Sequence, residues 1–348
     1  MIVQEIYNRL VKARRPHDFF GNVGENEQKL LFRTYAKAIH PDTVSDSQLY
    51  IAEQAMMLLN KLNEQAIEEY RAGTYAVTDT VDLYKKGSPL FEFELERKAH
   101  RFYEHFFKGE VGNIYTGTNG EYVIFLKVAA DPADNDLIRN EFKTLNVTKH
   151  HSLPVVENQV MINDRFAFVM REIEGTPIPK LMAEYPHGVS AEHIMWMLER
   201  LFSVVGYLHS KKIVHGNIKP EHVIVNKKIH NMSLCGFSLC ITEADRPTAR
   251  YKVANEVYSP PEISKTAKVL PCADIYAIGK LAILLLGGDV KTNAMPDTVD
   301  ESIRAFLRKL VVSDYTARPN DAWKLWDEAI AIRTKLFDYK NKRFIELK

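Results

Sequence analysis

The stretch from Ile213 to Asn226, which reads IVHGNIKPEHVIVN, constrains the fold of this chain more than any other. The apolar run Val223–Val225 predicts a strand. Before it lies a polar segment that carries His215, Lys219 and Pro220. Upstream, apolar residues recur at helical spacing between Ile194 and Leu208 and predict a buried helix that leads directly into this segment. We therefore expect a polar loop held between a buried helix and a strand.

The loop resembles the catalytic loop of protein kinases, whose pattern is H-R-D-x-K-x-x-N. In that family the Asp accepts the proton of the substrate hydroxyl, and the Asn holds a magnesium ion. Here Asn217 stands at the Asp position and His222 at the Asn position, while His215, Lys219 and Pro220 keep the frame. The resemblance implies a phosphotransfer fold without ordinary phosphotransfer chemistry.

From about Phe91 onward the order of features is similar to that of the bilobal kinase fold. Between Phe102 and Val128 we expect a strand, a glycine turn, a second strand, a turn and a third strand. Gly109 and Gly112 resemble the later glycines of the G-x-G-x-x-G loop, where glycine lets backbone amides approach phosphate oxygens. Phe107 at the first glycine position and Glu110 within the loop both argue against an easy phosphate cradle.

Lys127, in the run VIFLKV, resembles the lysine of the V-A-I-K strand that pairs with nucleotide phosphates. Glu141, on a predicted helix, stands where kinases carry the glutamate that orients this lysine. The two form either a remnant of a nucleotide pocket or a structural ion pair. The segment Phe166–Gly175 resembles the edge strand and the hinge between the lobes, with Met170 at the position that gates the back of the pocket.

Gly236 and Phe237 stand where the family carries the first two residues of Asp-Phe-Gly, whose Asp holds magnesium. Glycine has no side chain to bind a cation, whereas Phe237 can still pack against the helix beneath it. Three positions implied to support the fold are intact: Glu262 of the A-P-E-like segment, Asp274, which ties the catalytic loop to a central helix, and Arg318, which pairs with that glutamate.

These replacements predict an inactive kinase-like domain, because a positioned base is typically worth about 10² to 10⁴ in rate. Metal neutralisation of phosphate charge adds to that loss. An alternative stays open: a divergent kinase or nucleotide transferase that uses Lys127, Glu141, Lys219 and His222. We expect no resident metal ion and no certain cofactor, although ATP binding without a metal is possible chemistry for such a pocket.

Three helical patterns lie before residue 74. Ile2, Ile6 and Leu10 recur at helical spacing until Pro16, and a second amphipathic pattern covers residues 26–39. A third begins near Ser47, a plausible N-cap, and ends near residue 73. These patterns predict two antiparallel helices joined by a loop that carries the sequence His-Pro-Asp.

Residues 18–70 resemble the J-domain of DnaJ-type co-chaperones. The resemblance rests on Asp18–Phe20, on FRTYAKAIHPD from Phe32 to Asp42, and on KLNEQA from Lys61 to Ala66. It implies stimulation of the ATPase of a DnaK-type chaperone. The residues implied in that contact are Lys29, Arg33, Lys37, His40, Pro41 and Asp42. Thr34 and Thr43 depart from the family by standing where basic residues are common, which predicts weaker electrostatic steering. A helical hairpin that only supports the fold is the alternative.

Composition restricts the class of protein further. Lys and Arg number 46 and Asp and Glu 45, a formal net charge of +1 that indicates neither nucleic acid nor an anionic membrane as a partner. The apolar run Ala277–Leu286 is shorter than the about 20 residues that span a bilayer, and polar residues near the start predict no secretory signal. Cys235, Cys240 and Cys272 match neither zinc nor disulfide spacing. We expect a cytoplasmic protein with reduced thiols.

The expected architecture is therefore multidomain: an all-α, J-domain-like helical hairpin over residues 1–74, a linker over 75–90, and an α+β bilobal kinase-like domain over 91–348. The small lobe is expected to end at about residue 172. The main functional prediction is a J-domain co-chaperone whose inactive kinase-like domain binds an unknown protein client. The alternatives are the divergent transferase and a non-catalytic interaction scaffold.

Overall fold

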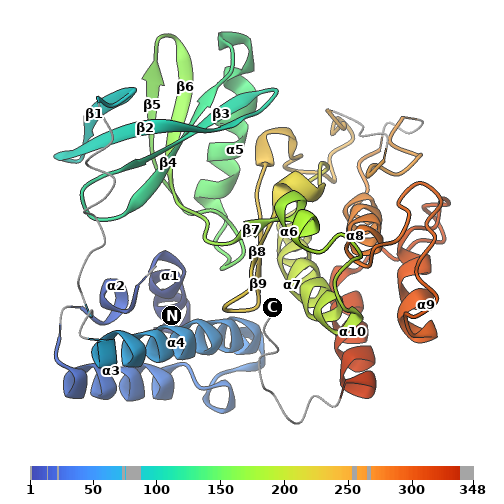
Figure 1. Ribbon diagram of the computed structural model, residues 1–348, viewed down its shortest axis with the longest axis horizontal. Helices are drawn as coiled ribbons and strands as arrows, with labels where there is room; N and C mark the ends of the chain where they lie inside the picture. Colours follow the sequence, from blue (N-terminus) through green and yellow to red (C-terminus); the bar gives the residue numbers. More distant parts are fainter. Residues whose placement is uncertain are drawn as a thin grey trace.

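The computed structural model describes residues 2–13, 15–21, 23–72, 75, 88–252, 257–264 and 268–337. Four N-terminal helices form one module, a β-sheet with one long helix forms a small lobe, and a mainly helical large lobe follows (Figure 1). The N-terminal helices lie below the sheet and beside the large lobe in this view.

The N-terminal module has its own apolar core. Its elements are α1 (Ile2–Lys12), α2 (Pro16–Phe20), α3 (Glu25–Ala38), the 3-10 turn Pro41–Thr43 and α4 (Asp46–Ala72). Helix α1 buries Ile6, Tyr7 and Leu10 on one stripe, as its spacing predicts. The remaining core residues include Phe19, Phe20, Ile39, Ala52, Ala55, Leu59 and Leu62.

The predicted helical hairpin is confirmed, with two changes at helix ends. Pro16 opens α2 at its first position, where a missing N–H costs nothing, in addition to ending the first pattern. Ser47 lies inside α4, which begins at Asp46. Most of the predicted linker, residues 76–87, lies outside the described residues.

The small lobe is an antiparallel sheet with the strand order β1-β2-β3-β4-β6-β5. Its strands are β1 (Phe91–Leu95), β2 (Lys98–Lys108), β3 (Gly112–Thr118), β4 (Val123–Ala129), β5 (Val156–Ile162) and β6 (Arg165–Arg171). The turn Pro132–Asp134 leads into α5 (Asn135–Val147), which packs against β4, β5 and β6. The strand, glycine turn, strand, turn and strand predicted from Phe102 to Val128 are thereby confirmed.

The prediction that the segment beginning at Phe166 is an edge strand is wrong. It forms β6, which pairs with β4 on one side and with β5 on the other, so that β5 is the edge. The burial of all five central residues, Phe166–Met170, fits this interior place, because an interior strand of a covered sheet is apolar on both faces.

The large lobe follows the hinge that leaves β6. A small sheet joins β7 (Thr176–Pro177), β8 (Val223–Asn226) and β9 (Asn231–Leu234). The helices are α6 (Ile178–Glu184), α7 (Ala191–Ser210), α8 (Cys272–Leu285), α9 (Glu301–Leu310) and α10 (Ala322–Leu336). The 3-10 turns Pro220–His222 and Phe237–Leu239 bracket β8 and β9 and carry the residues of interest for function.

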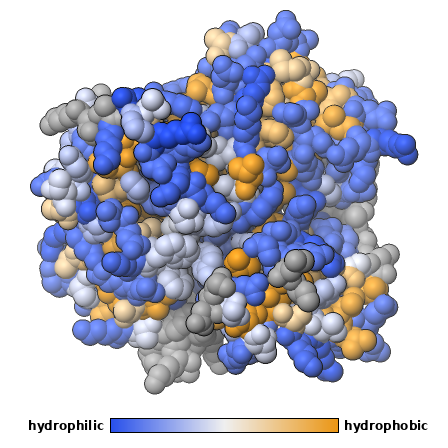
Figure 2. Space-filling view, turned by 180° about the vertical axis from the view of Figure 1, so that it is seen from behind, coloured by the Kyte–Doolittle hydropathy of each residue, from blue (hydrophilic) through white to orange (hydrophobic). Residues whose placement is uncertain are grey.

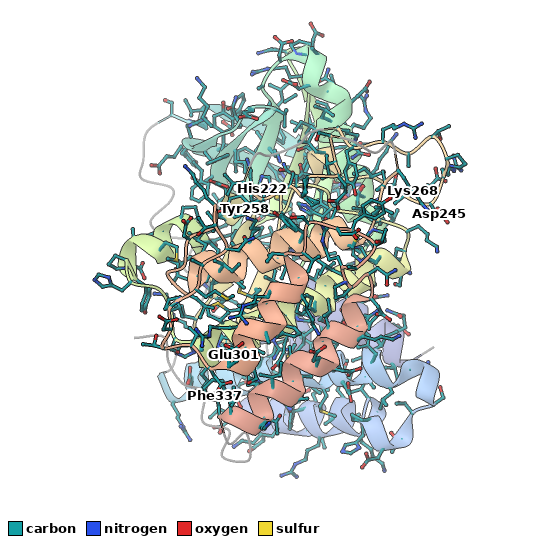
Figure 3. All side chains as sticks on the ribbon, turned by 90° about the vertical axis from the view of Figure 1, so that its right-hand side faces the viewer. His222, Asp245, Tyr258, Lys268, Glu301 and Phe337 are labelled. Atoms are coloured by element: carbon teal, nitrogen blue, oxygen red, sulfur yellow. The ribbon has the colours of Figure 1, made fainter. Side chains whose placement is uncertain are left out.

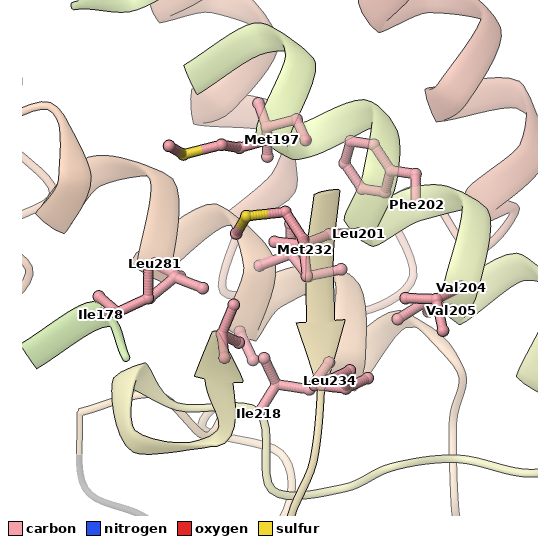
Figure 4. Packing of buried hydrophobic residues seen from close by; sticks show 14 of the residues in the cluster. Ile178, Met197, Leu201, Phe202, Val204, Val205, Ile218, Met232, Leu234 and Leu281 are labelled. Atoms are coloured by element: carbon pink, nitrogen blue, oxygen red, sulfur yellow. The ribbon is translucent and has the colours of Figure 1, made fainter. Parts of the chain in front are cut away.

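One apolar core joins the two lobes. In Figure 4, Met197, Leu201, Val204 and Val205 of α7 pack over Ile218, Met232 and Leu234. The predicted buried helix is thus confirmed as the base beneath the loop. Hydrophilic residues cover most of the opposite face of the molecule, with apolar groups between them (Figure 2). Among the described residues, no helix combines the length and the apolar character that a membrane span requires.

Candidate functional site

Lys127 and Glu141 form a buried ion pair in the small lobe, between β4 and α5. The Lys127 Nζ on β4 donates to the Glu141 Oε2 on α5 at 2.6 Å. The two residues are 8% and 2% exposed. Loss of either partner would leave the other charge buried without a counter-charge, which costs unfolding free energy.

Helix α5 is fixed against the segment that follows β9. The Asn140 Nδ2 donates to the carbonyl oxygens of Ser238 at 3.3 Å and Cys240 at 3.1 Å, and the Thr144 Oγ1 lies 3.3 Å from the Cys240 Sγ. Burial raises the pKa of Cys240 to about 11, so the thiol stays protonated at neutral pH. These contacts set the position from which α5 presents Glu141 to Lys127.

The glycine turn between β2 and β3 is tight. The Gly109 N–H donates to the Gly112 carbonyl at 3.1 Å, and a β-carbon on Gly109 would lie 2.7 Å from that oxygen. A β-carbon on Gly112 would lie 2.8 Å from Ile138 and 3.2 Å from the Lys127 Cε. A side chain at position 109 would therefore clash with the backbone, whereas one at position 112 would require the Ile138 side chain to move. Gly112 brings the backbone close to the lysine. Glu110 at the turn is exposed.

An aromatic pair lies on the side of β4 that carries Lys127. The strand register places Phe125 opposite Met170, on the same face of β4 as Lys127. Phe106 stacks on Phe125 with ring centroids 5.0 Å apart, although Phe106 itself is 57% exposed. Sequence reasoning missed both residues. The available signal was the second position of V-A-I-K, where alanine is usual and this chain has Phe125.

Asp274 at the start of α8 holds the backbone of the catalytic-like loop. Its carboxylate accepts the N–H groups of His215 at 2.9 Å and Gly216 at 2.8 Å, and its third partner is the His209 Nε2 at 2.9 Å. Burial would raise the pKa of Asp274, but the hydrogen bond from His209 and the charges beside it outweigh burial and lower that pKa. The geometry matches the tie expected of Asp274. His209 was not predicted.

His222 occupies the space of a missing side chain at position 236. Gly236 has φ +81°, and a β-carbon there would lie 2.5 Å from the imidazole Cδ2 of His222. The His222 Nδ1 lies 2.7 Å from the Asn217 carbonyl and donates to it. Burial, with added repulsion from His215, Lys219 and Lys127, lowers the pKa of His222 to about 3. The ring is therefore neutral at physiological pH and lies near two lysines.

This arrangement does not fit the two magnesium ions of the usual kinase site. The carboxylate position is Gly236, the amide position is an imidazole, and the ring of His222 excludes a larger residue at 236. In the part of the chain that the structure describes, no three His, Cys, Asp or Glu side chains gather as a metal site.

The supporting positions of the large lobe are joined as expected. Arg318 donates to both carboxylate oxygens of Glu262, at 2.6 and 3.1 Å, and both side chains are buried. Phe237 is fully buried and meets the ring of His215 edge-on at 4.6 Å. The His215 Nε2 bonds the Cys235 carbonyl at 3.0 Å, so His215 joins the loop to the segment around Gly236.

A model of the protein kinase domain matches residues 103–343, which is more than half of the chain. This chain belongs to the protein kinase family. The match begins within β2 and ends beyond α10, so the kinase domain includes both lobes and excludes the N-terminal module.

Relatives of this kinase are weakly similar and much longer. A serine/threonine-protein kinase dkf-2 of Caenorhabditis briggsae is 23% identical over 56% of this chain and 17% of its own length. A mitogen-activated protein kinase 13 of Oryza sativa subsp. indica is 26% identical over 56% of this chain and 41% of its own. A serine/threonine-protein kinase D3 of Mus musculus is 21% identical over 68% of this chain and 26% of its own. The chain thus spans less than half the length of these relatives.

The prediction of a J-domain co-chaperone with an inactive kinase-like domain is corrected by these findings. The family match covers the kinase domain, the relatives are named as kinases, two of them as serine/threonine kinases, and the divergent-transferase alternative fits them better. The replaced residues Asn217, His222 and Gly236 stand in a domain whose Lys127–Glu141 pair is assembled. Phosphoryl transfer depends mainly on positioning and charge, which scaffold residues also supply.

The residues predicted to contact a chaperone lie together on the N-terminal module of this kinase. His40 precedes the turn, its Nδ1 accepts the Asp42 N–H at 3.3 Å, and Asp42 is exposed. Pro41 opens the turn, Lys29 pairs with Glu25 at 2.6 Å, and Arg33 and Lys37 are exposed. A DnaK-type chaperone as their partner stays a prediction.

A small cavity lies beside Asn217 in the large lobe of the kinase domain. Tyr258, Pro260, Ile263 and Asp274 are among the residues that line it. Burial raises the pKa of Tyr258 to about 12, so its hydroxyl is un-ionised. Figure 3 labels His222 and Tyr258 near the junction of the two lobes. The cavity places a recess next to the position that carries the base in other kinases.

Proposed function

We propose that this chain is a phosphotransferase of the protein kinase family that takes its phosphoryl group from a nucleoside triphosphate. Lysine side chains, rather than two magnesium ions, balance the phosphate charge. The observation that carries the proposal is the Lys127–Glu141 pair at 2.6 Å, which is assembled and buried. In kinases this pair is one of two features that must be in place for transfer; the other is the metal site, whose role the lysines would take here.

The residues that would hold the nucleotide lie around that pair. Lys127 would meet the phosphates, Gly109 and Gly112 would admit them to the backbone of the turn, and Met170 would border the base. Gly112 fits this role because its missing β-carbon leaves the space beside the Lys127 Cε open. When bound, the nucleotide would supply the phosphoryl group.

Two lysines lie near His222, since Lys127 and Lys219 both contribute to lowering its pKa. Charge concentrated in a partly enclosed site acts more strongly than on an open surface, because water screens it less. Lys127 and Lys219 would therefore bind and orient a polyphosphate chain without a metal ion.

The reaction is expected to be slow. Asn217 is an amide and cannot take a proton, and His222, with a pKa of about 3, is a weak base whose Nδ1–H is already bonded to the Asn217 carbonyl. A missing general base costs about 10² to 10⁴ in rate. The acceptor hydroxyl would thus lose its proton to water as transfer proceeds. Because the relatives are named serine/threonine kinases, we take a protein serine or threonine as the acceptor.

Transfer of labelled γ-phosphate from ATP, to the chain itself and to mixed protein substrates, tests the proposal. We expect slow incorporation that persists when EDTA replaces magnesium, and we expect Lys127→Ala to abolish it. Lys127→Arg is the matched control, since arginine keeps a positive charge beside Glu141 but presents it on a planar guanidinium group. Its rate should fall between those of the wild type and Lys127→Ala.

Absence of transfer with magnesium, manganese or chelator would overturn the proposal. Transfer that Lys127→Ala leaves unchanged would also overturn it, because the label would then come from a contaminating kinase. A thermal shift of the wild type by ATP with EDTA, lost in Lys127→Ala, provides an independent measure of metal-free binding.

A further inference from the structure

The N-terminal module contacts the kinase domain through two tyrosines that sequence analysis did not single out. Tyr50 of α4 places its hydroxyl 2.8 Å from the Ser203 Oγ on α7 and 3.0 Å from the His150 Nε2. Its ring meets Trp323 of α10 edge-on at 4.7 Å. Tyr7 of α1 is 4% exposed and hydrogen-bonds the backbone of His151.

The hydrogen-bond directions at Tyr50 follow from its neighbours. The His150 Nδ1 accepts the Ser152 N–H at 3.1 Å, so the proton of this neutral imidazole is on Nε2. Burial lowers the pKa of His150 to about 3, which keeps the ring neutral. Nε2–H therefore donates to the Tyr50 hydroxyl at 3.0 Å and lies farther, at 3.4 Å, from the Ser203 Oγ. The Tyr50 and Ser203 hydroxyls share a further hydrogen bond at 2.8 Å, so Tyr50 is the closest partner of both residues in this cluster.

His150 and Ser203 belong to different lobes. His150 lies in the loop that joins α5 to β5 in the small lobe, and Ser203 lies on α7 of the large lobe. A single phenol from the N-terminal module therefore bonds both lobes. The module also contacts the hinge: Arg171, at the end of β6, donates through Nη1 to the Lys12 carbonyl.

The contacted loop begins one residue after α5 ends. Thr148 is bonded back to Thr144 through both its N–H and its Oγ1, at 3.1 and 2.8 Å, and the Lys149 N–H donates to the Tyr207 hydroxyl at 2.8 Å. The loop cannot shift without moving the last turn of α5. That helix carries Glu141, whose distance to Lys127 determines whether the ion pair exists.

We infer that the N-terminal module is a built-in clamp, in which Tyr50 is a positioning residue that holds α5 and both lobes in the arrangement where Lys127 meets Glu141. The clamp deepens the proposed function. Only its expected effect on phosphoryl transfer rests on that function. The positional effect on α5 exists whether or not transfer occurs.

Hydrogen exchange by mass spectrometry on the full chain without nucleotide tests the clamp. Tyr50→Phe removes the hydroxyl and keeps the ring against Trp323. We expect about tenfold faster exchange in residues 139–153, the change that corresponds to about 1.4 kcal/mol of hydrogen bonding. Ser203→Ala should give a smaller change in the same peptides, because the bond to His150 remains.

Tyr35→Phe is the matched control. It also removes a tyrosine hydroxyl of the N-terminal module, but its partner is Arg9 within the module, at 3.1 Å. Exchange in residues 139–153 should match the wild type in this variant. Unchanged exchange in Tyr50→Phe, or equal acceleration in Tyr50→Phe and Tyr35→Phe, would overturn the clamp, the second because it shows general loosening.

The transfer assay separates this inference from the proposed function. With the clamp, Tyr50→Phe should raise the KM for ATP more than it lowers kcat, since a displaced Glu141 weakens the grip of Lys127 on phosphate. A wild type that transfers nothing, but whose Tyr50→Phe variant exchanges faster in α5, would reject the phosphotransferase and support the clamp. Transfer by the wild type, together with unchanged exchange in Tyr50→Phe, would support the phosphotransferase and reject the clamp.

Discussion

The small-lobe end and the large-lobe end of the candidate site differ in charge. At the small-lobe end Lys127 and Glu141 keep opposite charges in contact, whereas at the large-lobe end Asn217, His222 and Gly236 carry no charge at neutral pH. The large-lobe end nevertheless stays packed and hydrogen-bonded, since His222 fills the space at 236 and bonds the Asn217 carbonyl. At the large-lobe end, uncharged residues therefore fill the space and form the hydrogen bonds.

Removing one member of the small-lobe pair should have the largest effect. Lys127→Ala leaves Glu141 buried and unpaired, which typically costs about 3–5 kcal/mol of unfolding free energy. Urea denaturation followed by circular dichroism measures this loss. The double variant Lys127→Met, Glu141→Leu should regain most of the stability without regaining nucleotide binding. Equal stability of Lys127→Ala and the wild type would show that the pair is not buried as described.

Acid should lower the unfolding free energy of the chain through two buried histidines, His222 in the large lobe and His150 beside Tyr50. The pKa values of His222 and His150 are about 3 in the folded chain, against an ordinary 6.5. Between these values the unfolded chain binds protons that the folded chain does not, so stability falls as pH falls from about 6.5 toward 3. Each histidine contributes about 1.4 kcal/mol per pH unit, and the unfolding free energy should be flat above pH 7.

Urea midpoints at pH 5, 6, 7 and 8 check this slope. His222→Asn should reduce the slope by the contribution of one histidine. A wild type equally stable at pH 5 and 8 would contradict the buried neutral imidazoles.

Restoring a side chain at position 236 should have an intermediate effect. Gly236→Asp places a β-carbon 2.5 Å from His222 at a φ of +81°, and overpacking of this kind costs about 1–3 kcal/mol. Adding His222→Asn should recover about 1 kcal/mol or more by removing the clash, a coupling that a double-mutant cycle measures. The double variant should also gain magnesium dependence in the transfer assay. Additive single effects would refute the steric coupling.

The smallest effect is expected at the exposed aromatic residue of the small-lobe end. Phe106→Ala removes the stacking on Phe125, which is worth about 0.5–1.5 kcal/mol for such pairs. A cycle with Phe125→Leu isolates that interaction in thermal unfolding. Additive effects of Phe106→Ala and Phe125→Leu would mean that the two rings do not stack in solution.

Local sequence patterns were enough to predict the helices and strands that depend on neighbouring residues. The stripe of Ile6 and Leu10 predicts α1, the buried helix before the loop is α7, and the order of motifs places Lys127, Glu141 and Asp274 correctly on strand and helices. The bilobal fold and its supporting pairs were implied by the resemblance of these motifs to those of protein kinases.

What the sequence concealed depends on contacts between distant residues. Tyr50 and His150 are 100 positions apart, and no periodicity predicts their bond. The interior place of β6 depends on which strands pair, and the fit of His222 into the space at Gly236 depends on the path of the backbone. The functional prediction failed for a related reason: residue identity at three positions says little about how the neighbouring charges are arranged.

The close fit between His222 and Gly236 also restricts the routes by which this site can change. A carboxylate at position 236 clashes with the imidazole as long as His222 is present, because the ring atoms lie within 2.7 Å of where its β-carbon would be. Changing position 222 first instead leaves an unfilled space beside a glycine. Either order of substitution toward a carboxylate at position 236 therefore passes through a less stable protein, so the present pair is easier to keep than to leave.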